Sequence, residues 1–340
     1  MKALFIGGTG TISMAISRKL IAEGHELYLL NRGNRNSELP EGAISLVADI
    51  NDEAKVLELI GDQTFDVVAD FIAFRPEQVE RDHRLFAGRT RQYIFISSAA
   101  TYSKPVSNYI ITEGTTQENV SWEYARNKIA CEELLLGYYR SERFPMTIVR
   151  PSHTYDERRV PLGVEAPNGP WPVMSRMLRG KPVLVHGDGT SLWTLTHNSD
   201  FAKGFVGLMG NVRAVGEIVQ ITSDEALTWN DIFQATANAL GVEFKPYYVS
   251  TKFMEACAYA PGMMDGLWGD KSHSVVFDNS KLKRLTPGYQ ATMTFSEGVR
   301  RTVAYMLAHP ETQQENPEFD AWCDRVIEAQ EAALRAVRGE

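Results

Sequence analysis

The sequence predicts an α/β fold, with a doubly wound parallel sheet and a smaller C-terminal lobe. Short apolar runs alternate with amphipathic helical patterns from residue 1 to about residue 150, which is typical of βαβ units that form a parallel sheet. The first apolar run ends in glycines, and a helical pattern follows it directly. A chain of 340 residues is long for a single hydrophobic core, so a second lobe is expected.

The first strand and helix are joined by a glycine turn. Residues 3–6 are a short apolar run, as expected of a buried parallel strand, and residues 11–23 have helical periodicity. Gly7 and Gly10 occupy the first two positions of a Gly-x-x-Gly-x-x-Gly spacing, and Ser13, also a small residue, occupies the third. Such a turn is typical of Rossmann-type dinucleotide binding, because glycines let the backbone approach a pyrophosphate at a helix N-terminus. An ordinary tight turn is the alternative interpretation.

The second strand, residues 26–30, is followed by a basic segment. An acidic residue at this point would bind the adenosine ribose hydroxyls and favour NAD. The chain has Asn31, Arg32 and Arg35 there instead. Guanidinium groups suit a 2'-phosphate, so we expect NAD(P) as cofactor, with NADP slightly favoured over NAD. A solvated basic loop is the alternative.

The next strands complete the expected cofactor cleft. We expect a third strand that ends in residues 47–50, where Asp49 could bond the adenine amino group, and a fourth strand over residues 65–74. Strands over residues 93–96 and 146–149 follow. The residues that we expect to bind the cofactor from this part of the chain are Gly7, Gly10, Thr11, Ile12, Asn31, Arg32, Arg35, Asp49, Ile50, Phe71, Ile72 and Ala73.

Tyr124 and Lys128 lie four residues apart in a helical pattern, which places them on one helix face about one turn apart. An unperturbed tyrosine, with a pKa of about 10, is a poor base at neutral pH. A neighbouring ammonium lowers that pKa, so the pair could exchange a proton with a substrate hydroxyl or carbonyl. Solvated surface pairs share this spacing, and it is the glycine turn at the start of the chain that strengthens the catalytic interpretation.

The glycine turn, Ser98, Tyr124 and Lys128 together resemble the short-chain dehydrogenase/reductase superfamily. The length and the C-terminal half resemble its extended branch, the NAD(P)-dependent nucleotide-sugar epimerases, dehydratases and reductases. The resemblance implies that Tyr124 is the acid/base, that Lys128 lowers its pKa and binds the nicotinamide ribose, and that Ser98 orients the reacting carbonyl. Ser98, Tyr124 and Lys128 are therefore the predicted catalytic residues, and Tyr124 and Lys128 are also expected to contact the cofactor.

Residues 150–155 resemble an Arg-Pro-x-Asn-x-Tyr segment of that family, which implies that Pro151 and His153 also contact the cofactor. His153 replaces the asparagine of the motif, and Trp193 stands where the family has an arginine for the substrate diphosphate. These departures argue against a standard nucleotide-sugar substrate. The tentative substrate contacts are Ser98, Ala99, Ala100, His153 and Trp193.

Two of these residues have equally good structural interpretations. His153 could be a satisfied structural histidine, and Trp193 could stack on a substrate ring or close the interface between the lobes. Ala99 and Ala100 follow Ser98, where dehydratases of the family have acidic residues. Because elimination of water needs an additional acid/base, dehydration is a less expected reaction than simple redox chemistry or epimerisation.

The expected function is hydride transfer by an NAD(P)-dependent oxidoreductase or epimerase, at a secondary alcohol or ketone of a sugar or sugar-nucleotide-like substrate. The alternative is a non-catalytic atypical member that senses NADP or binds RNA, because residues 31–33 and the altered glycine motif resemble such proteins. The chain keeps both Tyr124 and Lys128, which favours the enzyme.

Composition narrows the classes of partner. The net charge of −8 and the pI of about 5.5 give no electrostatic footprint for nucleic acid. No apolar run approaches the ~20 residues that span a bilayer, and no signal peptide precedes the first strand, so we expect a cytoplasmic protein without a membrane partner. Three scattered cysteines form no metal motif. The family resemblance implies a homodimer and a small-molecule substrate.

The expected domain organisation assigns residues 1–160 to the NAD(P)-binding domain, with residues 195–225 returning to it. Residues 161–194 and 226–340 would form the substrate lobe and a C-terminal helix. The methionine- and aromatic-rich stretch 247–268 suits the core of that lobe better than an apolar substrate pocket. A long loop, residues 103–121, is expected to act as a flap over the substrate, and an amphipathic tail helix over residues 319–337 to cover the body of the protein.

Overall fold

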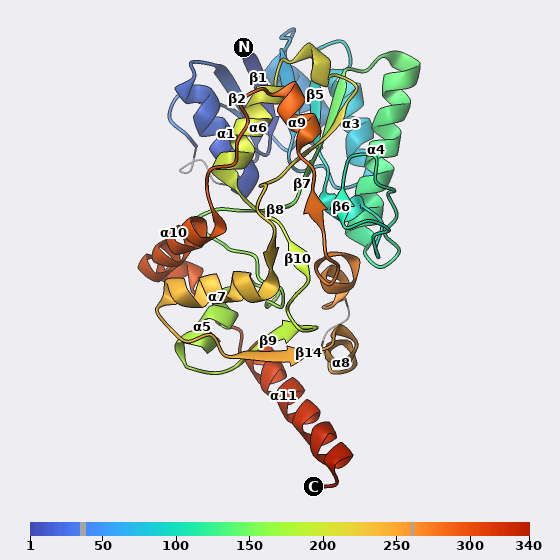
Figure 1. The fold of residues 1–340 in the computed structure, drawn as a ribbon. Coiled ribbons are helices and arrows are strands. Elements are labelled where there is room, and N and C mark those ends of the chain that lie inside the picture. The colour runs from blue at the N-terminus through green and yellow to red at the C-terminus, as the bar shows by residue number, and fades with distance from the viewer. Residues whose placement is uncertain (35–38, 260–261) are drawn as a thin grey trace.

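A computed structural model of the protein describes residues 1–34, 39–259 and 262–340. In Figure 1 the seven-stranded sheet and its helices form the upper part, strand β6 lies beside α4, and most of the remaining short strands and helices form the lower part. Within the described residues, no helix is long and apolar enough to cross a membrane. The same residues contain no cluster of three or more His, Cys, Asp or Glu side chains that could hold a metal ion.

The central sheet is entirely parallel and has the order β12-β7-β5-β4-β1-β2-β3. Its strands are β1 Lys2–Ile6, β2 Glu26–Asn31, β3 Ile44–Val47, β4 Val67–Asp70, β5 Tyr93–Ile96, β7 Met146–Pro151 and β12 Ile218–Ile221. The chain reverses direction across the sheet between β1 and β4, and in open α/β sheets ligands bind at such a switch point. The predicted Rossmann-type α/β fold is confirmed.

Alternation along the buried strands explains why helices cover both faces. In β1, Ala3 and Phe5 pack in one cluster with α1 and α6, whereas Leu4 and Ile6 pack in another with α2, α3 and α4. The helices of these two faces are α1 Thr11–Ala22, α2 Glu53–Ile60, α3 Pro76–Phe86, α4 Glu123–Glu142, α6 Asn198–Leu208 and α9 Ser280–Leu285. Cys131, on α4, is buried as a small apolar residue in the second cluster.

The lower part has its own core, built from short strand pairs and five helices. The pairs are β8 His153–Tyr155 with β11 Leu195–His197, β9 Val183–His186 with β14 Pro246–Val249, β10 Leu192–Trp193 with β13 Leu227–Thr228, and β6 Ile110–Ile111 with β15 Val276–Phe277. The helices are α5 Trp171–Leu178, α7 Trp229–Leu240, α8 Thr251–Ala256, α10 Phe295–Ala308 and α11 Pro317–Arg338. Short helical turns are η2 Ala99–Thr101, η3 Val212–Ala214, η4 Leu267–Lys271 and η5 Pro310–Thr312. Met254, Met264 and Leu267 are buried in this core, as expected for the methionine-rich stretch.

Two strand predictions extend too far. The third strand ends at Val47, so Asp49 and Ile50 lie in the loop beyond it. The fourth strand covers Val67–Asp70 only, because the Asp70 carboxylate accepts hydrogen bonds from the backbone N–H groups of Ile72 and Ala73 and turns the chain there. The predicted flap, residues 103–121, contains strand β6, which pairs with β15. The side-chain amide of Gln220, on β12, donates to the carbonyls of Ile111 and Asp278 and so ties this loop to the edge of the central sheet.

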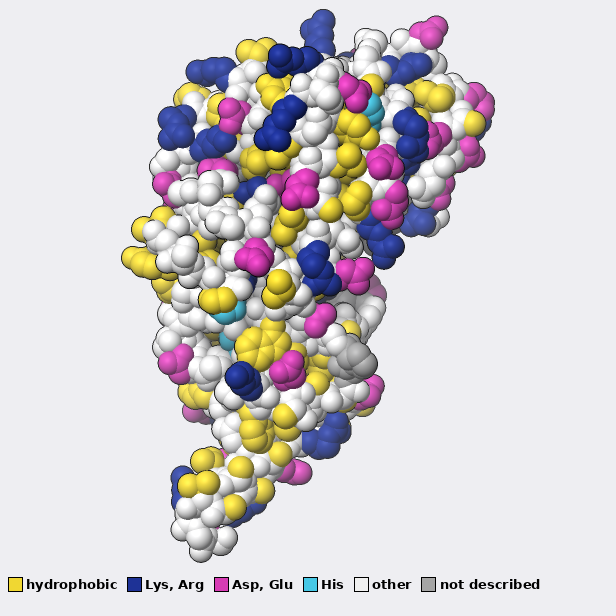
Figure 2. All heavy atoms as spheres, turned by 90° about the vertical axis from the view of Figure 1, so that its right-hand side faces the viewer, with side chains coloured by type: hydrophobic (Ala, Val, Ile, Leu, Met, Phe, Trp, Pro, Cys, Tyr) yellow, Lys and Arg dark blue, Asp and Glu magenta, His cyan; other side chains and the backbone are white. Residues whose placement is uncertain are grey.

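The surface carries charges of both signs. Figure 2 shows Lys and Arg side chains interspersed with Asp and Glu over the face that it presents.

The C-terminal helix α11 covers the body only along its first half. Trp322 is fully buried and its indole N–H donates to the carbonyl oxygen of Cys257, whereas Leu334 and Val337 are exposed. The expectation that the tail helix covers the body over residues 319–337 is therefore confirmed only for its first half, because α11 extends beyond the last element beneath it (Figure 1).

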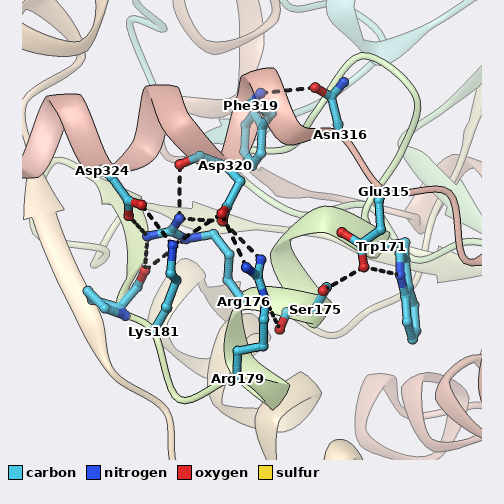
Figure 3. A network of polar contacts seen from close by, with 11 residues as sticks. Trp171, Ser175, Arg176, Arg179, Lys181, Glu315, Asn316, Phe319, Asp320 and Asp324 are labelled. Carbon is cyan, nitrogen blue, oxygen red and sulfur yellow. Dashed lines mark hydrogen bonds and ion pairs between the residues drawn. The ribbon is translucent and has the colours of Figure 1, made fainter.

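An ion-pair network fixes this first half of α11 to α5. The guanidinium of Arg176, whose side chain is 1% exposed, bonds the carboxylates of Asp320 and Asp324 (Figure 3). Lys181 bonds the same two carboxylates, and Glu315 accepts from the indole of Trp171. These contacts hold the end of the chain against the lower part.

Candidate active site

A cavity of about 970 Å³ lies above the carboxyl ends of β1, β4, β5 and β7. The cofactor-binding residues predicted from the sequence that line it are Gly7, Gly10, Thr11, Ile12, Asn31, Arg32, Asp49, Ile50, Phe71, Ile72, Tyr124, Lys128, Pro151 and His153. The predicted substrate contacts Ser98, Ala99, Ala100, His153 and Trp193 line it too. Ala73 is buried behind the wall and does not line it, because its backbone is turned toward Asp70 and Lys128. Arg35 lies outside the described residues.

The glycine turn requires glycine at one position above all. Gly7 has a φ of +82°, and a Cβ there would lie 2.5 Å from Cγ2 of Ile72 on the neighbouring turn. Ser13, in the place of a third glycine, is buried and ties the turn together: its hydroxyl accepts from the N–H of Gly10 at 2.9 Å and donates to the carbonyl of Gly7 at 3.0 Å. Gly10 is the N-cap of α1, so the positive end of that helix faces the cavity.

The end of β2 has no carboxylate. The amide oxygen of Asn31 accepts from the N–H of Gly33, and its amide nitrogen is buried with no hydrogen-bond partner among the described residues. Arg32 lines the cavity beside it. This arrangement fits the adenosine end of NAD(P), because it offers a free donor, a guanidinium and, from Asp49, an acceptor.

The end of β4 is held by a buried charge network that sequence analysis missed. Arg81 donates to Asp70 at 3.2 Å and to the amide oxygen of Asn51 at 2.9 Å, and so joins the turn after β4 to the loop after β3. Burial and the charge of Asp70 raise the pKa of Asp82, which also accepts from the hydroxyl of Tyr93. In the sequence, a carboxylate at the end of an apolar strand, Asp70, is the signal that could have indicated a polar network here. Its partner Arg81 could not be inferred, because it lies on another element.

Lys128 is directed into the sheet. Its ammonium donates to the carbonyl oxygen of Ala73, at 2.7 Å, in the turn after β4, and to that of Ile96, at 2.6 Å, the last residue of β5. Burial lowers the pKa of Lys128 to about 8. The ammonium lies 5.9 Å from the centre of the Tyr124 ring. In this structure Lys128 therefore acts mainly on backbone carbonyls.

Tyr124 lies one helical turn before Lys128 and faces the same cavity as Ser98. Burial raises the pKa of Tyr124, its interaction with Ser98 lowers that pKa, and the charge of Asp270 raises it. The expectation of a lowered pKa is therefore not met in this structure, because burial outweighs the hydroxyl and Lys128 is engaged elsewhere. The hydroxyl oxygen of Ser98 also accepts from the N–H of Ala100.

A buried ion pair lies beneath these residues. Glu132, one turn after Lys128 on α4, accepts from Arg150 at 3.0 and 2.6 Å and from the hydroxyl of Ser97. Both partners of the ion pair are almost fully buried. The bidentate geometry and the additional donors satisfy the carboxylate. The pair fixes α4 against β5 and β7.

The histidines have different environments. Burial lowers the pKa of His153 well below its ordinary value, so this ring is neutral at physiological pH, and its Nδ1 has no hydrogen-bond partner among the described residues. His197 accepts from the N–H of Ser199 as the N-cap of α6, in keeping with a structural role.

Two charged residues at the cavity were missed by sequence analysis. Asp270, from η4, lines the cavity, and Lys104, from the loop after β5, lies 3.7 Å from it. They are distant in sequence and belong to no motif, so no pattern could pair them.

The sheet, the glycine turn and the cavity above them define a dinucleotide-binding protein of the α/β class. A family model described as the NAD dependent epimerase/dehydratase family matches residues 3–222. The chain belongs to this family.

Relatives of known name differ in function. The chain is 26% identical to a 2'-dehydrokanamycin reductase of Streptomyces kanamyceticus over 291 residues, which cover 85% of this chain and 80% of that protein. It is 29% identical to the chloroplast stem-loop binding protein of 41 kDa b of Arabidopsis thaliana over 255 residues, 71% of this chain and 63% of that protein.

Solved structures share the fold. The UDP-glucuronic acid 4-epimerase of Bacillus cereus in complex with NAD superposes with a TM-score of 0.69 at 19% identity, covering 91% of this chain and 99% of that chain. The UDP-glucose 4-epimerase of Thermotoga maritima gives a TM-score of 0.71 at 20% identity, with the same coverage.

The role of the glycine turn can be tested with two variants, Gly7→Ala and Gly10→Ala, of which the second is the control for stability. Gly7→Ala should lower the free energy of unfolding by about 1–3 kcal/mol without cofactor, because of the positive φ and the contact with Ile72. Gly10→Ala should leave that stability nearly unchanged, because its φ is −84° and a Cβ there meets only the Ser13 hydroxyl at 3.5 Å. It should still weaken NADPH binding, since Gly10 lines the cavity at the N-terminus of α1, where the backbone must approach the pyrophosphate closely. Urea unfolding and fluorescence titration measure the two effects. Equal loss of stability in both variants, or full NADPH affinity in Gly10→Ala, would contradict this account.

Proposed function

We propose that the protein transfers a hydride between NAD(P) and a secondary alcohol or ketone carbon of a sugar or sugar-nucleotide-like substrate, with Tyr124 as acid/base. The observation that carries the proposal is the convergence of Ser98, Tyr124 and Lys128 on the same cavity as the glycine turn. Membership of the NAD dependent epimerase/dehydratase family supports it independently. The proposal covers reduction and epimerisation at such a carbon.

The protein's part in the reaction is to position the substrate and move a proton. The nicotinamide ring supplies or accepts the hydride when the cofactor is bound. The phenol of Tyr124, whose pKa is raised by burial, keeps its proton at neutral pH, the state that can donate to a ketone oxygen as it becomes an alcohol. Ser98 donates a hydrogen bond to the same oxygen, and Lys128 keeps a positive charge on this side of the cavity when protonated.

NADP is the cofactor that the nucleotide end of the cavity favours. Arg32 lines the cavity at the end of β2, where Asn31 stands in place of a carboxylate. A guanidinium binds a 2'-phosphate through paired, charge-assisted hydrogen bonds, whereas a carboxylate there would repel it.

An RNA-binding function, suggested by the name of the Arabidopsis relative, has less support. The chain has a net charge of −8, and the face shown in Figure 2 carries interspersed charges rather than a continuous basic surface among the described residues. The retained serine, tyrosine and lysine have no use in that function.

Tyr124→Phe tests the acid/base role. The variant should lose at least about 100-fold in kcat, because proton transfer from a positioned side chain contributes on that scale, while NADPH affinity stays near normal. Tyr248→Phe, which removes a phenol hydroxyl on the distant strand β14, is the matched control and should keep full activity. Turnover is followed as NADPH oxidation with a panel of ketosugars and their nucleotide derivatives. Wild-type turnover in Tyr124→Phe would end the assignment.

Arg32→Ala tests the cofactor preference. It should weaken NADP binding about tenfold or more and leave NAD binding nearly unchanged, since a charge-assisted bond contributes ~1.5–3 kcal/mol. Arg18→Ala makes the same change of charge at an exposed position of α1 outside the cavity. Titration of both cofactors by fluorescence gives the comparison. Equal effects of Arg32→Ala on NADP and NAD would rule out a phosphate contact.

A further inference from the structure

Three buried polar atoms without hydrogen-bond partners among the described residues gather on the substrate side of the cavity. They are Nζ of Lys104, Oδ1 of Asp270 and the indole Nε1 of Trp193. Asp270 and Trp193 line the cavity, and Lys104 lies against both, 3.7 Å from the carboxylate and 5.7 Å from the centre of the indole ring. These residues come from three distant segments of the chain, so the fold brings them together rather than local sequence.

Lys104 and Asp270 are a poorly compensated ion pair. Their side chains are only 3% and 10% exposed, and the separation of 3.7 Å is too long for a hydrogen bond. Burial lowers the pKa of Lys104 and raises that of Asp270 to about 6. Buried charges that lack hydrogen bonds destabilise a folded protein, so a pair built only for stability would be expected to make closer contact.

The chemistry of the three groups selects a hydroxyl-bearing ligand. The ion pair has no net charge, and a hydroxyl can donate to Asp270 while accepting from Lys104. Trp193 adds an apolar ring with one free N–H donor, and it is itself stacked on Trp229 at 6.0 Å. An apolar ring beside a donor and an acceptor suits the C–H face and hydroxyls of a sugar.

The surroundings of Asp270 are poorly suited to bind a diphosphate. Within the described part of the chain, the cations that line the cavity are Arg32, Arg81 and Lys128. Arg32 lies at the nucleotide end, Arg81 is bonded to buried carboxylates, and Lys128 is bonded to two carbonyls. Asp270 would instead repel phosphate oxygens.

We propose that Lys104, Asp270 and Trp193 form a subsite for an uncharged sugar ring, free or glycosidically linked, in place of a subsite for the diphosphate of a nucleotide sugar. This inference rests on the proposed function, because it concerns the substrate of the same site. Asp270 and Trp193 line the same cavity as Ser98 and Tyr124, so a ring bound here shares that cavity with the proposed acid/base.

The experiment compares ligand binding by four single variants and one double variant of the full-length protein saturated with NADPH. Asp270→Asn and Lys104→Met alter the subsite, and Asp224→Asn and Lys283→Met alter an ion pair whose side chains are 46% and 47% exposed, outside the cavity. The probes are methyl glycosides of glucose, galactose and mannose, maltose, UDP-glucose and dTDP-glucose. Saturation-transfer NMR and calorimetric titration measure their affinities.

At least one uncharged glycoside should bind the wild type, and Asp270→Asn and Lys104→Met should each weaken it about tenfold or more, while the two control variants bind normally. The double variant Lys104→Met/Asp270→Asn, which leaves no unpaired charge in the interior, should keep about the wild-type unfolding temperature and still bind the glycoside weakly, which separates a binding role from a structural one. The proposal is overturned if only the nucleotide sugars bind, if no probe binds, or if glycoside binding is unchanged in both subsite variants. NADPH binding by the same proteins is read separately, so failure here is distinguishable from failure of the proposed function.

Discussion

The active-site geometry depends on how α4 is anchored to the sheet. Lys128 and Glu132 lie one turn apart on its buried face. Lys128 is bonded to the carbonyls of Ala73, in the turn after β4, and Ile96, at the end of β5, and Glu132 is bonded to Arg150 of β7. Two opposite charges, both satisfied by hydrogen bonds in the interior, set the position and rotation of the helix. Tyr124, one turn earlier on the same face, is carried into the cavity as a consequence.

The same anchoring explains why the tyrosine and lysine differ from the simple picture of a cation that activates a phenol. The Lys128 ammonium is committed to backbone carbonyls, and the pKa of Tyr124 rises because of burial. A protonated phenol beside Ser98 is suited to proton donation, which is the step that the proposed reduction of a ketone requires of Tyr124.

Much of the fold and part of the site could be predicted from sequence, because the signals are local. The glycine turn, the apolar runs of the buried strands and the Tyr124–Lys128 spacing each lie within a short segment. What could not be predicted depends on long-range packing: Arg81 joining two loops, and Lys104 meeting Asp270. The prediction that the whole tail helix covers the body was wrong in its second half for a related reason. Amphipathic periodicity does not reveal where the surface beneath a helix ends.

The most direct test of the central claim is a crystal structure of the protein with NADP bound. The account predicts that the nicotinamide ring lies within about 5 Å of the Tyr124 hydroxyl, leaving room for one substrate oxygen between that phenol and Ser98. It also predicts that α4 keeps its contacts through Lys128 and Glu132. A nicotinamide ring bound on the far side of the cavity, or a Tyr124 hydroxyl turned away from it, would contradict the account.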